Sequence, residues 1–367
     1  MLVGRLLHPR VNGTWQRPVR RDVRSALRAL SSTTPWAPPA ALSSLHVDAH
    51  LAELASLCYT ASDGELESRL QAAGLRLVRT GTTHFTRFFV ADSEAPPAGG
   101  EPHRYVCIRG VSWAAPASEP VRVWRSLANF WPTPFLPHLT ERGSELVAHA
   151  GVSEMAAALW AEVRNPVESA RGQVTFAGHS LGGSLAALLT GLASLQLGIQ
   201  GDRLTCVSFG SPPVAALKHG GNGGDLPRAL RVPPSNLRSY VLDQDPVPRT
   251  LLAADPALAA LKELPAVRAL MGLRERLVGD GPVLSKSRFL YHAAGTVFLV
   301  RWEQERGYTV RQLHPADVAK ELAMDVEGMR AAPLRVAHAV LDHHSGSYAQ
   351  ALRSAAASMG QQRAFVT

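Results

Sequence analysis

The sequence lacks long hydrophobic runs and has few cysteines. No stretch of the 367 residues reaches the roughly 18 consecutive apolar residues of a membrane-spanning helix, so we expect any membrane contact to be peripheral. The three cysteines, Cys58, Cys107 and Cys206, are widely spaced and set among apolar neighbours. An odd number in this pattern argues against a disulfide framework or a cysteine metal site and predicts buried thiols.

Acidic residues are fewer than basic ones, 30 against 38, which gives a formal net charge of +8. Much of the excess lies between Arg5 and Arg28, where seven arginines face a single acid, Asp22. Charges nearly balance elsewhere, and the sequence contains no zinc-finger or other nucleic-acid-binding module, so we expect no nucleic-acid partner. A hydrophobic fraction of 46% over this length predicts a large folded core.

Residues 1–44 differ in composition from the rest of the chain. They are rich in arginine, poor in acids, and rich in Ser, Thr and Pro toward their end. This composition is typical of an organellar transit peptide, whereas a secretory signal would need a continuous apolar core. The alternatives are a disordered tail or an N-terminus left by imperfect gene prediction.

From residue 45 onward, strand-like and helix-like patterns alternate. The predicted helices cover residues 47–58, 65–73, 151–163, 181–195, 251–279 and 341–352, and the predicted strands cover 75–78, 86–90, 105–108, 173–177, 204–209, 237–242 and 295–300. This alternation predicts an α/β fold, in which one sheet carries helices on both faces. The glycine-rich segment 218–224 follows the candidate nucleophile described next and lacks phosphate-loop spacing, so we interpret it as a flexible surface loop.

The segment Gly178-His179-Ser180-Leu181-Gly182 lies between a predicted strand and a predicted helix. A serine at the apex of such a turn, with glycine two residues away on each side, is typical of a nucleophile elbow. The glycines are needed because a β-carbon would collide with the adjoining strand or helix. Ser180 is therefore the candidate nucleophile; the alternatives are a structural turn or a protein without activity.

A nucleophilic serine needs an acid and a histidine further along the chain. Asp245 follows the strand 237–242 and lies in a loop that we expect Pro246 and Pro248 to stiffen. Asp243 is the rival, although capping a turn is the usual role of an aspartate in that place. The sequence favours Asp245.

The later histidines are His292, His314, His338, His343 and His344. The adjacent pair His343 and His344 lies where a loop meets the last predicted helix. One of the two is expected to face Ser180, but periodicity does not say which.

The elbow resembles that of the class 3 (fungal-type triacylglycerol) lipases and their plant and algal relatives. Further blocks resemble this family in the same order: Val106-Cys107-Ile108-Arg109-Gly110, His149-Ala150-Gly151, Ser208-Phe209-Gly210-Ser211-Pro212, Asp245-Pro246-Val247-Pro248, and Asp342-His343 followed by Tyr348. The resemblance runs from about residue 50 to residue 352. It implies an α/β-hydrolase fold with a mostly parallel central sheet, and it selects Asp245 over Asp243 and His343 over His344.

The resemblance also implies what these residues do. Ser180 is the expected nucleophile, His343 its base and Asp245 the orienting acid, with an oxyanion hole made by the backbone N–H groups of Val111 and Leu181. Such a site uses no metal and no cofactor.

The chain departs from the family in two places. After Arg109-Gly110 the family usually has Ser or Thr, whose hydroxyl adds to the oxyanion hole, whereas this chain has Val111. Loss of one donor typically lowers the rate about a hundredfold or more, unless Ser112 substitutes. The inserts at 251–285 and 301–340 lengthen the region between acid and base, and we expect them to serve selectivity, membrane docking or surface elaboration.

The expected organisation is a transit-like or disordered segment (1–44), a lipase-like domain (45–355) and a tail (356–367). The expected function is a serine lipid acyl hydrolase that acts on triacylglycerol, phospholipid or galactolipid at a membrane or lipid-droplet surface. The aromatic region 113–139 lies where this family keeps its lid, and the alternative is that these side chains simply pack in the core. The alternatives for the function are a non-catalytic interaction protein and an esterase for small soluble esters. The expected location is the plastid, or else the cytoplasm or a membrane periphery.

Overall fold

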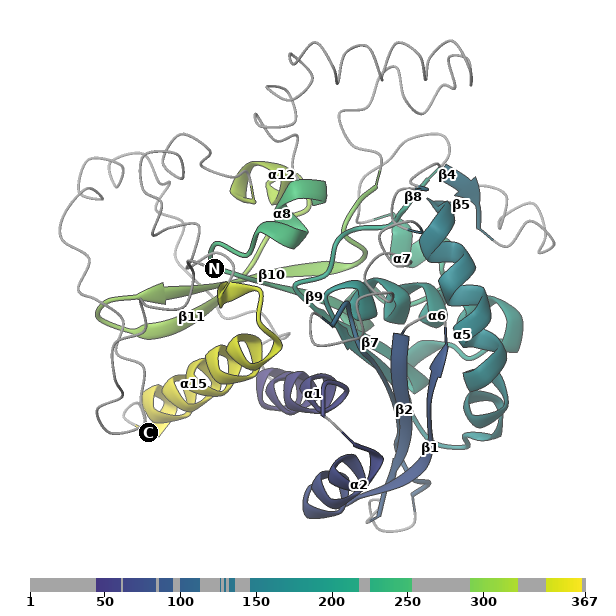
Figure 1. Ribbon diagram of the computed structural model, residues 1–367. Coiled ribbons are helices and arrows are strands. Elements are labelled where there is room, and N and C mark those ends of the chain that lie inside the picture. The colour runs from purple at the N-terminus through teal and green to yellow at the C-terminus, as the bar shows by residue number, and fades with distance from the viewer. Residues whose placement is uncertain are drawn as a thin grey trace, which may run out of the picture. The chain divides into compact units, whose positions relative to one another are not determined.

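The fold is built around an eight-stranded sheet (Figure 1). A computed structural model describes residues 44–60, 62–83, 86–94, 100–112, 126, 129, 132–135, 146–217, 225–252, 291–322 and 341–364. The segment 1–43, most of the aromatic region 113–139, the glycine-rich loop 218–224 and nearly all of the insert 251–285 lie outside these residues.

The strands of this sheet follow the order β1-β2-β3-β6-β7-β9-β10-β11. Their bounds are β1 Leu75–Thr83, β2 Thr86–Ser93, β3 Arg104–Ile108, β6 Val174–His179, β7 Leu204–Phe209, β9 Leu237–Leu242, β10 Thr296–Glu303 and β11 Gly307–Gln312. The five central strands, β3 to β10, pair in parallel, while β1, β2 and β11 pair antiparallel at the two edges. The mostly parallel central sheet is therefore confirmed.

Side chains of the central strands alternate between the two faces of the sheet, as the two-residue period of a strand requires. In β6, Phe176 packs in the hydrophobic cluster on one face and Ala177 in the cluster on the other. Every residue of β6 and of β9 is buried. Burial on both sides is the mark of a parallel sheet covered by two helical layers.

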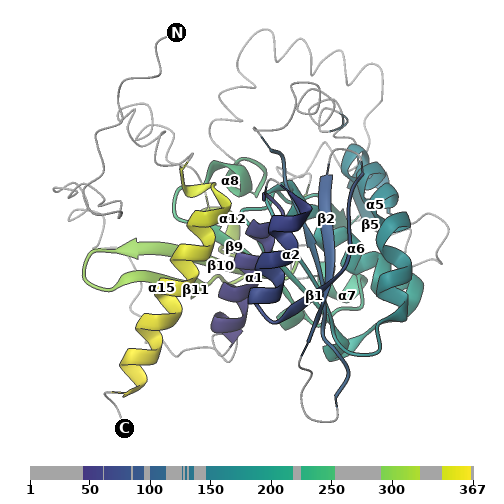
Figure 2. The same cartoon turned by 60° about the horizontal axis from the view of Figure 1, so that its bottom comes forward.

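Helices cover both faces, as predicted. On one side lie α5 (Ala150–Ser169) and α6 (Leu181–Leu197), and on the other α1 (Leu45–Leu57) and α15 (Ser345–Ala364). Figure 2 shows α1 and α15 side by side on their face of the sheet. The other helices of the described residues are α2 (Asp63–Ala72), α7 (Leu226–Ala229), α8 (Pro246–Leu252), α12 (Val318–Glu321) and two 3-10 turns, Gly201–Arg203 and Pro234–Asn236.

A buried ion pair fixes α1 to the sheet. The carboxylate of Asp48 accepts two 2.7 Å hydrogen bonds from the guanidinium of Arg238 on β9, and a third of 2.6 Å from the hydroxyl of Tyr240. Asp48 is fully buried, and these three donors offset the loss of its hydration.

Some elements were not expected from the sequence. Strands β4 (Pro132–Pro134), β5 (Leu146–His149) and β8 (Ala215–Leu217) form a small antiparallel sheet, and β11 closes a hairpin with β10. Phe135, from the aromatic region, is buried in the cluster beneath α5 and α6. For this residue the core interpretation is the correct one.

Other expectations are met or adjusted. Cys58, Cys107 and Cys206 are free and buried, as predicted. Pro246 begins the helix α8, so Asp245 precedes a helix and not an extended proline-stiffened loop.

The last helix, α15, continues to Ala364, and Ala356 and Met359 pack on the core, beyond the expected domain end at residue 355. Among the described helices, none combines the length and apolar character needed to cross a membrane.

Candidate active site

The turn between β6 and α6 holds Ser180 in a strained backbone conformation, with φ 57° and ψ −134°. Glycines make this turn possible. A β-carbon on Gly178 would lie 2.3 Å from the backbone of Gly182, and one on Gly182 would lie 2.1 Å from the carbonyl oxygen of Ile108 on β3. The turn therefore has the tight packing expected of a nucleophile elbow.

The side chain of Ser180 is directed toward a histidine. Ser180 occupies the N-cap position of α6 but makes no capping hydrogen bond with its side chain. Its Oγ lies 3.0 Å from Nε2 of His343, and Nδ1 of His343 lies 2.9 and 3.0 Å from the two carboxylate oxygens of Asp245. Three segments far apart in the sequence thus supply a continuous Ser–His–Asp arrangement.

Asp245 is fully buried and surrounded by donors. Besides His343, the hydroxyl of Tyr348 donates a 2.6 Å hydrogen bond to Oδ2, and the backbone N–H of Val247 donates one of 2.9 Å to Oδ1. Together with His343, these donors offset the loss of hydration of the buried carboxylate. The carboxylate is therefore equipped to face a histidine that gains positive charge.

The rival residues point elsewhere. Asp243 has a positive φ of 24°, and its Oδ1 accepts a hydrogen bond from the side chain of Gln244. His344 is exposed, and its Nδ1 accepts a hydrogen bond from the backbone N–H of Gly346. Of each pair, the structure brings Asp245 and His343 to Ser180.

Two contacts hold the loops that carry the acid and the histidine. The carboxylate of Asp342, next to His343, accepts a 3.1 Å hydrogen bond from the backbone N–H of Gln244, next to Asp245. The buried guanidinium of Arg249 donates to the carbonyls of Asp243 and Leu322, and burial lowers the pKa of this group. The loop after β9 is therefore tied both to the segment before α15 and to the end of α12.

The predicted oxyanion residues flank Ser180. A β-carbon on Gly110 would lie 2.7 Å from Cβ of Ser180, so the backbone leading into Val111 is against the elbow. The side chain of Val111 is half-buried and packs on the cluster under α5 and α6. Leu181 is the first residue of α6, where backbone N–H groups have no partner within the helix. Both N–H groups therefore lie near the serine.

Two further side chains at the site had no role expected from the sequence, those of Tyr59 and His179. Tyr59 lies just after α1, and its hydroxyl oxygen is 2.9 Å from Nδ1 of His179. His179 appeared only as the variable residue of the elbow and Tyr348 only as the end of a motif. Nothing local marks Tyr59, because it reaches the site from a segment 120 residues earlier.

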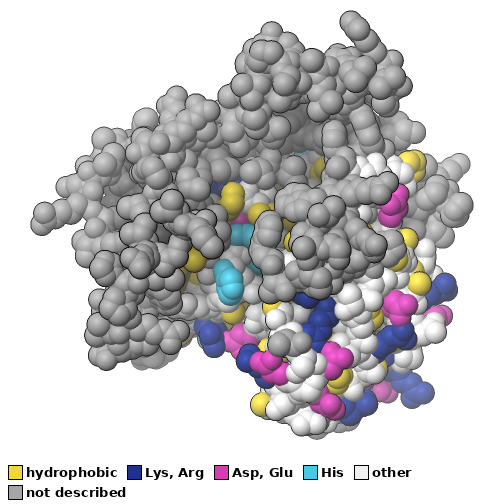
Figure 3. Space-filling model, viewed as in Figure 1, with side chains coloured by type: hydrophobic (Ala, Val, Ile, Leu, Met, Phe, Trp, Pro, Cys, Tyr) yellow, Lys and Arg dark blue, Asp and Glu magenta, His cyan; other side chains and the backbone are white. Residues whose placement is uncertain are grey.

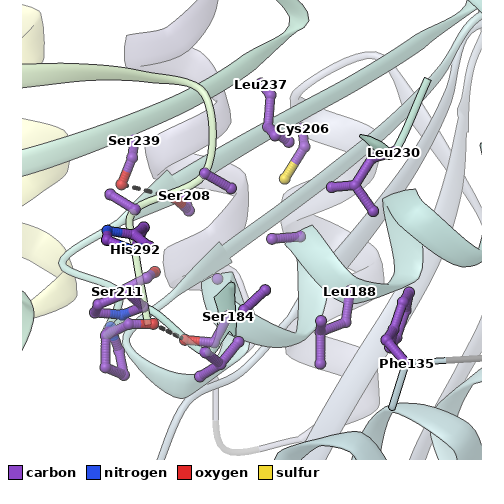
Figure 4. Close-up of a pocket in the computed structure, with 18 of the residues that line it drawn as sticks. Phe135, Ser184, Leu188, Cys206, Ser208, Ser211, Leu230, Leu237, Ser239 and His292 are labelled. Carbon is purple, nitrogen blue, oxygen red and sulfur yellow. Dashed lines mark hydrogen bonds between the residues drawn. The ribbon is translucent and has the colours of Figure 1, made fainter. Parts of the chain in front are cut away.

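A cavity that is partly open to solvent lies on the α6 face of the sheet. Figure 4 shows apolar side chains on one side of it, including Leu188, Leu230 and Leu237, and a polar group on the other, including Ser208 and His292. Ser180, Asp245 and His343 do not line it. The cavity is therefore separate from the Ser–His–Asp arrangement.

Neither a concentrated surface charge on the face seen in Figure 3 nor a metal-binding cluster is found among the described residues. On the face seen in Figure 3, the described basic and acidic side chains are interspersed. Within the described ranges, no group of three or more His, Cys, Asp or Glu side chains is arranged to hold a metal ion.

Residues 116–254 match the family described as Lipase (class 3). Two curated relatives from Arabidopsis thaliana are phospholipase A1 PLIP1, chloroplastic, which is 25% identical over 229 residues, and phospholipase A1 PLIP2, chloroplastic, which is 28% identical over 210 residues. The alignments cover 59% and 54% of this chain but only 32% and 25% of the relatives' lengths.

The fold has solved counterparts. A triacylglyceride lipase of Rhizomucor miehei superposes with a TM-score of 0.50 at 18% identity, and the match covers 78% of this chain and 91% of that chain. A likeness at this identity supports the α/β-hydrolase fold. The family match includes Ser180 and Asp245, so the part of the chain that carries the elbow and the expected acid is similar to the class 3 lipase family.

Proposed function

We propose that the protein is a serine lipid acyl hydrolase, which cleaves carboxylic esters through an acyl-enzyme. The observation that carries this proposal is the hydrogen-bonded series from Ser180 Oγ through His343 to Asp245. A serine hydroxyl is a weak nucleophile by itself, and an adjacent base with an oriented imidazole activates it.

In the first half of the reaction, Nε2 of His343 takes the proton of Ser180 while Oγ attacks the ester carbonyl. Asp245 holds the imidazole through Nδ1–H and stabilises the imidazolium that forms. The carbonyl oxygen becomes negatively charged and is bound by the backbone N–H groups of Val111 and Leu181. His343 then gives its proton to the leaving alcohol, and the acyl group remains on Ser180.

In the second half, His343 takes a proton from water, and the resulting hydroxide attacks the acyl-enzyme. Collapse of the second tetrahedral intermediate releases the fatty acid and returns the proton to Ser180. Water and groups of this chain are the only participants besides the ester. The N-terminal end of α6 adds its favourable dipole at the developing oxyanion.

Two comparisons support lipids as the substrates. The two curated relatives are named as phospholipases A1, and the superposed structure is a triacylglyceride lipase. We include phospholipid, triacylglycerol and galactolipid in the proposed class. An esterase for small soluble esters would use the same three residues, and a non-catalytic interaction protein is the remaining alternative, since Val111 removes a hydroxyl from the oxyanion region.

The test is fatty-acid release by purified protein and its Ser180→Ala variant from neutral lipids, phospholipids and galactolipids. The proposal expects release by the wild type and a loss of about 10³-fold or more in the variant. Release confined to short soluble esters would favour the esterase. No release beyond that of the variant, on any ester, would favour the interaction protein.

The proposed location is the plastid, with peripheral contact at a membrane or lipid-droplet surface. The support is the arginine-rich composition of residues 1–44 and the word chloroplastic in the names of both relatives. Imaging a fusion with residues 1–44 beside one without them tests the location. Identical distributions of the two fusions would contradict the plastid location. Co-sedimentation of the protein with anionic and neutral vesicles tests the contact with a membrane surface.

A further inference from the structure

Three hydrogen bonds connect the oxyanion loop to the backbone of the proposed base. The N–H of Gly110 donates to the hydroxyl oxygen of Tyr59 over 3.0 Å. That oxygen lies 2.9 Å from Nδ1 of His179, and Nε2 of His179 lies 2.7 Å from the carbonyl oxygen of His343. This series of hydrogen bonds includes a residue of the elbow itself, because His179 directly precedes Ser180.

The direction of each bond follows from its ends. A carbonyl oxygen only accepts, so Nε2 of His179 carries a hydrogen and donates to His343. A neutral imidazole then has an acceptor at Nδ1, to which the hydroxyl of Tyr59 donates. Burial, together with the neighbouring His343, lowers the pKa of His179 well below 6.5, and burial raises the pKa of Tyr59. Both groups are thus in the protonation states that this series needs.

The surroundings leave these side chains little freedom. His179 is 5% exposed, and its ring packs against those of Tyr59, His343 and Tyr348 at centroid distances of 5.8, 4.8 and 5.7 Å. A β-carbon on Gly110 would approach the Tyr59 hydroxyl to 2.9 Å and the carbonyl oxygen of His179 to 2.7 Å. Movement of either side chain would therefore displace the oxyanion loop or the histidine backbone.

We infer that Tyr59 and His179 form a positioning pair, which sets the distance between the oxyanion loop and the base across Ser180. The inference rests on the proposed function of this site. Neither side chain is hydrogen-bonded to Oγ of Ser180 or to the imidazole of His343, so the pair acts through the backbone that it holds. It holds the backbone of His343 so that Nε2 meets Ser180, and it holds Gly110 so that the N–H of Val111 faces the developing oxyanion.

The experiment compares Tyr59→Phe, His179→Leu and His179→Gln with the wild type. Two assays are used. One measures the rate constant with which an alkyl fluorophosphonate modifies Ser180, and the other measures kcat and KM for hydrolysis of an ester. The ring in Tyr59→Phe would fill the same space but leave the buried Gly110 N–H without its acceptor, so we expect the rate constant to fall about tenfold with KM unchanged. We expect about a hundredfold loss for His179→Leu, and partial rescue in His179→Gln, whose amide N–H reaches the same carbonyl.

A double-mutant cycle separates a connected pair from two independent residues. If the two side chains act as one unit, Tyr59→Phe changes the rate constant by less than about twofold in the His179→Leu background. Tyr240→Phe is the matched control, since it removes a buried tyrosine hydroxyl on the same side of the sheet, bonded to Asp48. It should lower stability and leave the fluorophosphonate rate unchanged.

The inference is overturned if Tyr59→Phe lowers only the melting temperature, or if the two losses simply multiply. Failure of the proposed function looks different: the wild type would then release no fatty acid, whether or not the probe reacts. Where the probe labels no serine, the proton signal of His343 Nδ1–H is the second readout. A signal that does not move in Tyr59→Phe relative to the wild type overturns the inference in that case also.

Discussion

The hydroxyl of Tyr348 donates a 2.6 Å hydrogen bond to Oδ2 of Asp245 and accepts one of 3.0 Å from the backbone N–H of Leu242. Tyr348 lies on α15, five residues after His343. The segment that supplies the proposed base therefore also holds the acid against the end of β9. Burial and the nearby Asp245 raise the pKa of Tyr348, so the hydroxyl keeps its proton.

Tyr348→Phe should lower both stability and rate. The change leaves the Leu242 N–H without its acceptor and removes one donor from a buried carboxylate, which we expect to cost about 1–3 kcal/mol of unfolding free energy. The imidazole of His343 is then less firmly oriented, and kcat should fall about tenfold. Urea unfolding and initial rates measure the two effects. Tyr240→Phe changes an equally buried tyrosine and should lower stability without lowering kcat. An unchanged kcat in Tyr348→Phe would contradict the expected role of Tyr348 in orienting His343.

The two neighbouring aspartates should differ sharply in their effect on catalysis. Asp245→Asn places an amide against Nδ1 of His343 and should lower kcat by roughly 10⁴-fold, while the fold remains intact. Asp243→Asn is the matched control. It changes the same functional group two residues earlier, in a backbone conformation that asparagine tolerates, and should alter kcat by less than about twofold. Comparable losses in the two variants would reject the assignment of Asp245.

Local patterns in the sequence account for much of the fold. Strand, glycine-flanked serine and helix follow one another without interruption at β6 and α6, and β7 and β9 are short segments of mostly apolar residues, as expected in a buried sheet. The hairpin strand β11 was missed because only one of its six residues is buried, so no apolar period marks it. The small strands β4 and β8 span three residues each and have too little sequence for a period.

Some residues of the candidate site could also be predicted from the sequence, and others could not. Ser180 follows from its place between a predicted strand and a predicted helix, and chain order with the neighbouring prolines favours Asp245. His343 was selected over His344 only by the resemblance to class 3 lipases. Residues 179 and 348 are visible only as members of a motif, without their contacts. Tyr59 is invisible in the sequence, since its role depends on where the end of α1 meets a turn 120 residues later. Long-range packing of this kind is set by the whole fold and leaves no local pattern.

The buried His179 should make the stability depend on pH. Its pKa lies well below 6.5 in the folded protein, so the folded state keeps it neutral while the unfolded chain takes up a proton as the pH falls below 6.5. The unfolded state then binds more protons, and stability decreases by up to about 1.4 kcal/mol per pH unit from this group. His179→Gln removes this contribution.

Urea unfolding of both proteins between about pH 5 and pH 8 is the measurement. At the upper end, the difference between wild type and variant gives the pH-independent cost of the substitution. That difference should shrink as the pH falls below 6.5, because only the wild type loses stability through this group. Two parallel curves would show that His179 gains a proton in the folded protein as readily as in the unfolded chain.

Val111→Thr should raise activity by supplying the hydroxyl that class 3 lipases usually carry at this position. Threonine has nearly the shape of valine, and Val111 is half-buried and directly follows Gly110, which packs against Ser180. An added donor stabilises charge that develops only in the transition state, so kcat should rise by about tenfold or more with little change in KM. Val111→Ala, which removes contacts without adding a donor, should only lower stability. If Val111→Thr leaves kcat unchanged and Ser112→Ala lowers it about a hundredfold, the hydroxyl is already provided by Ser112.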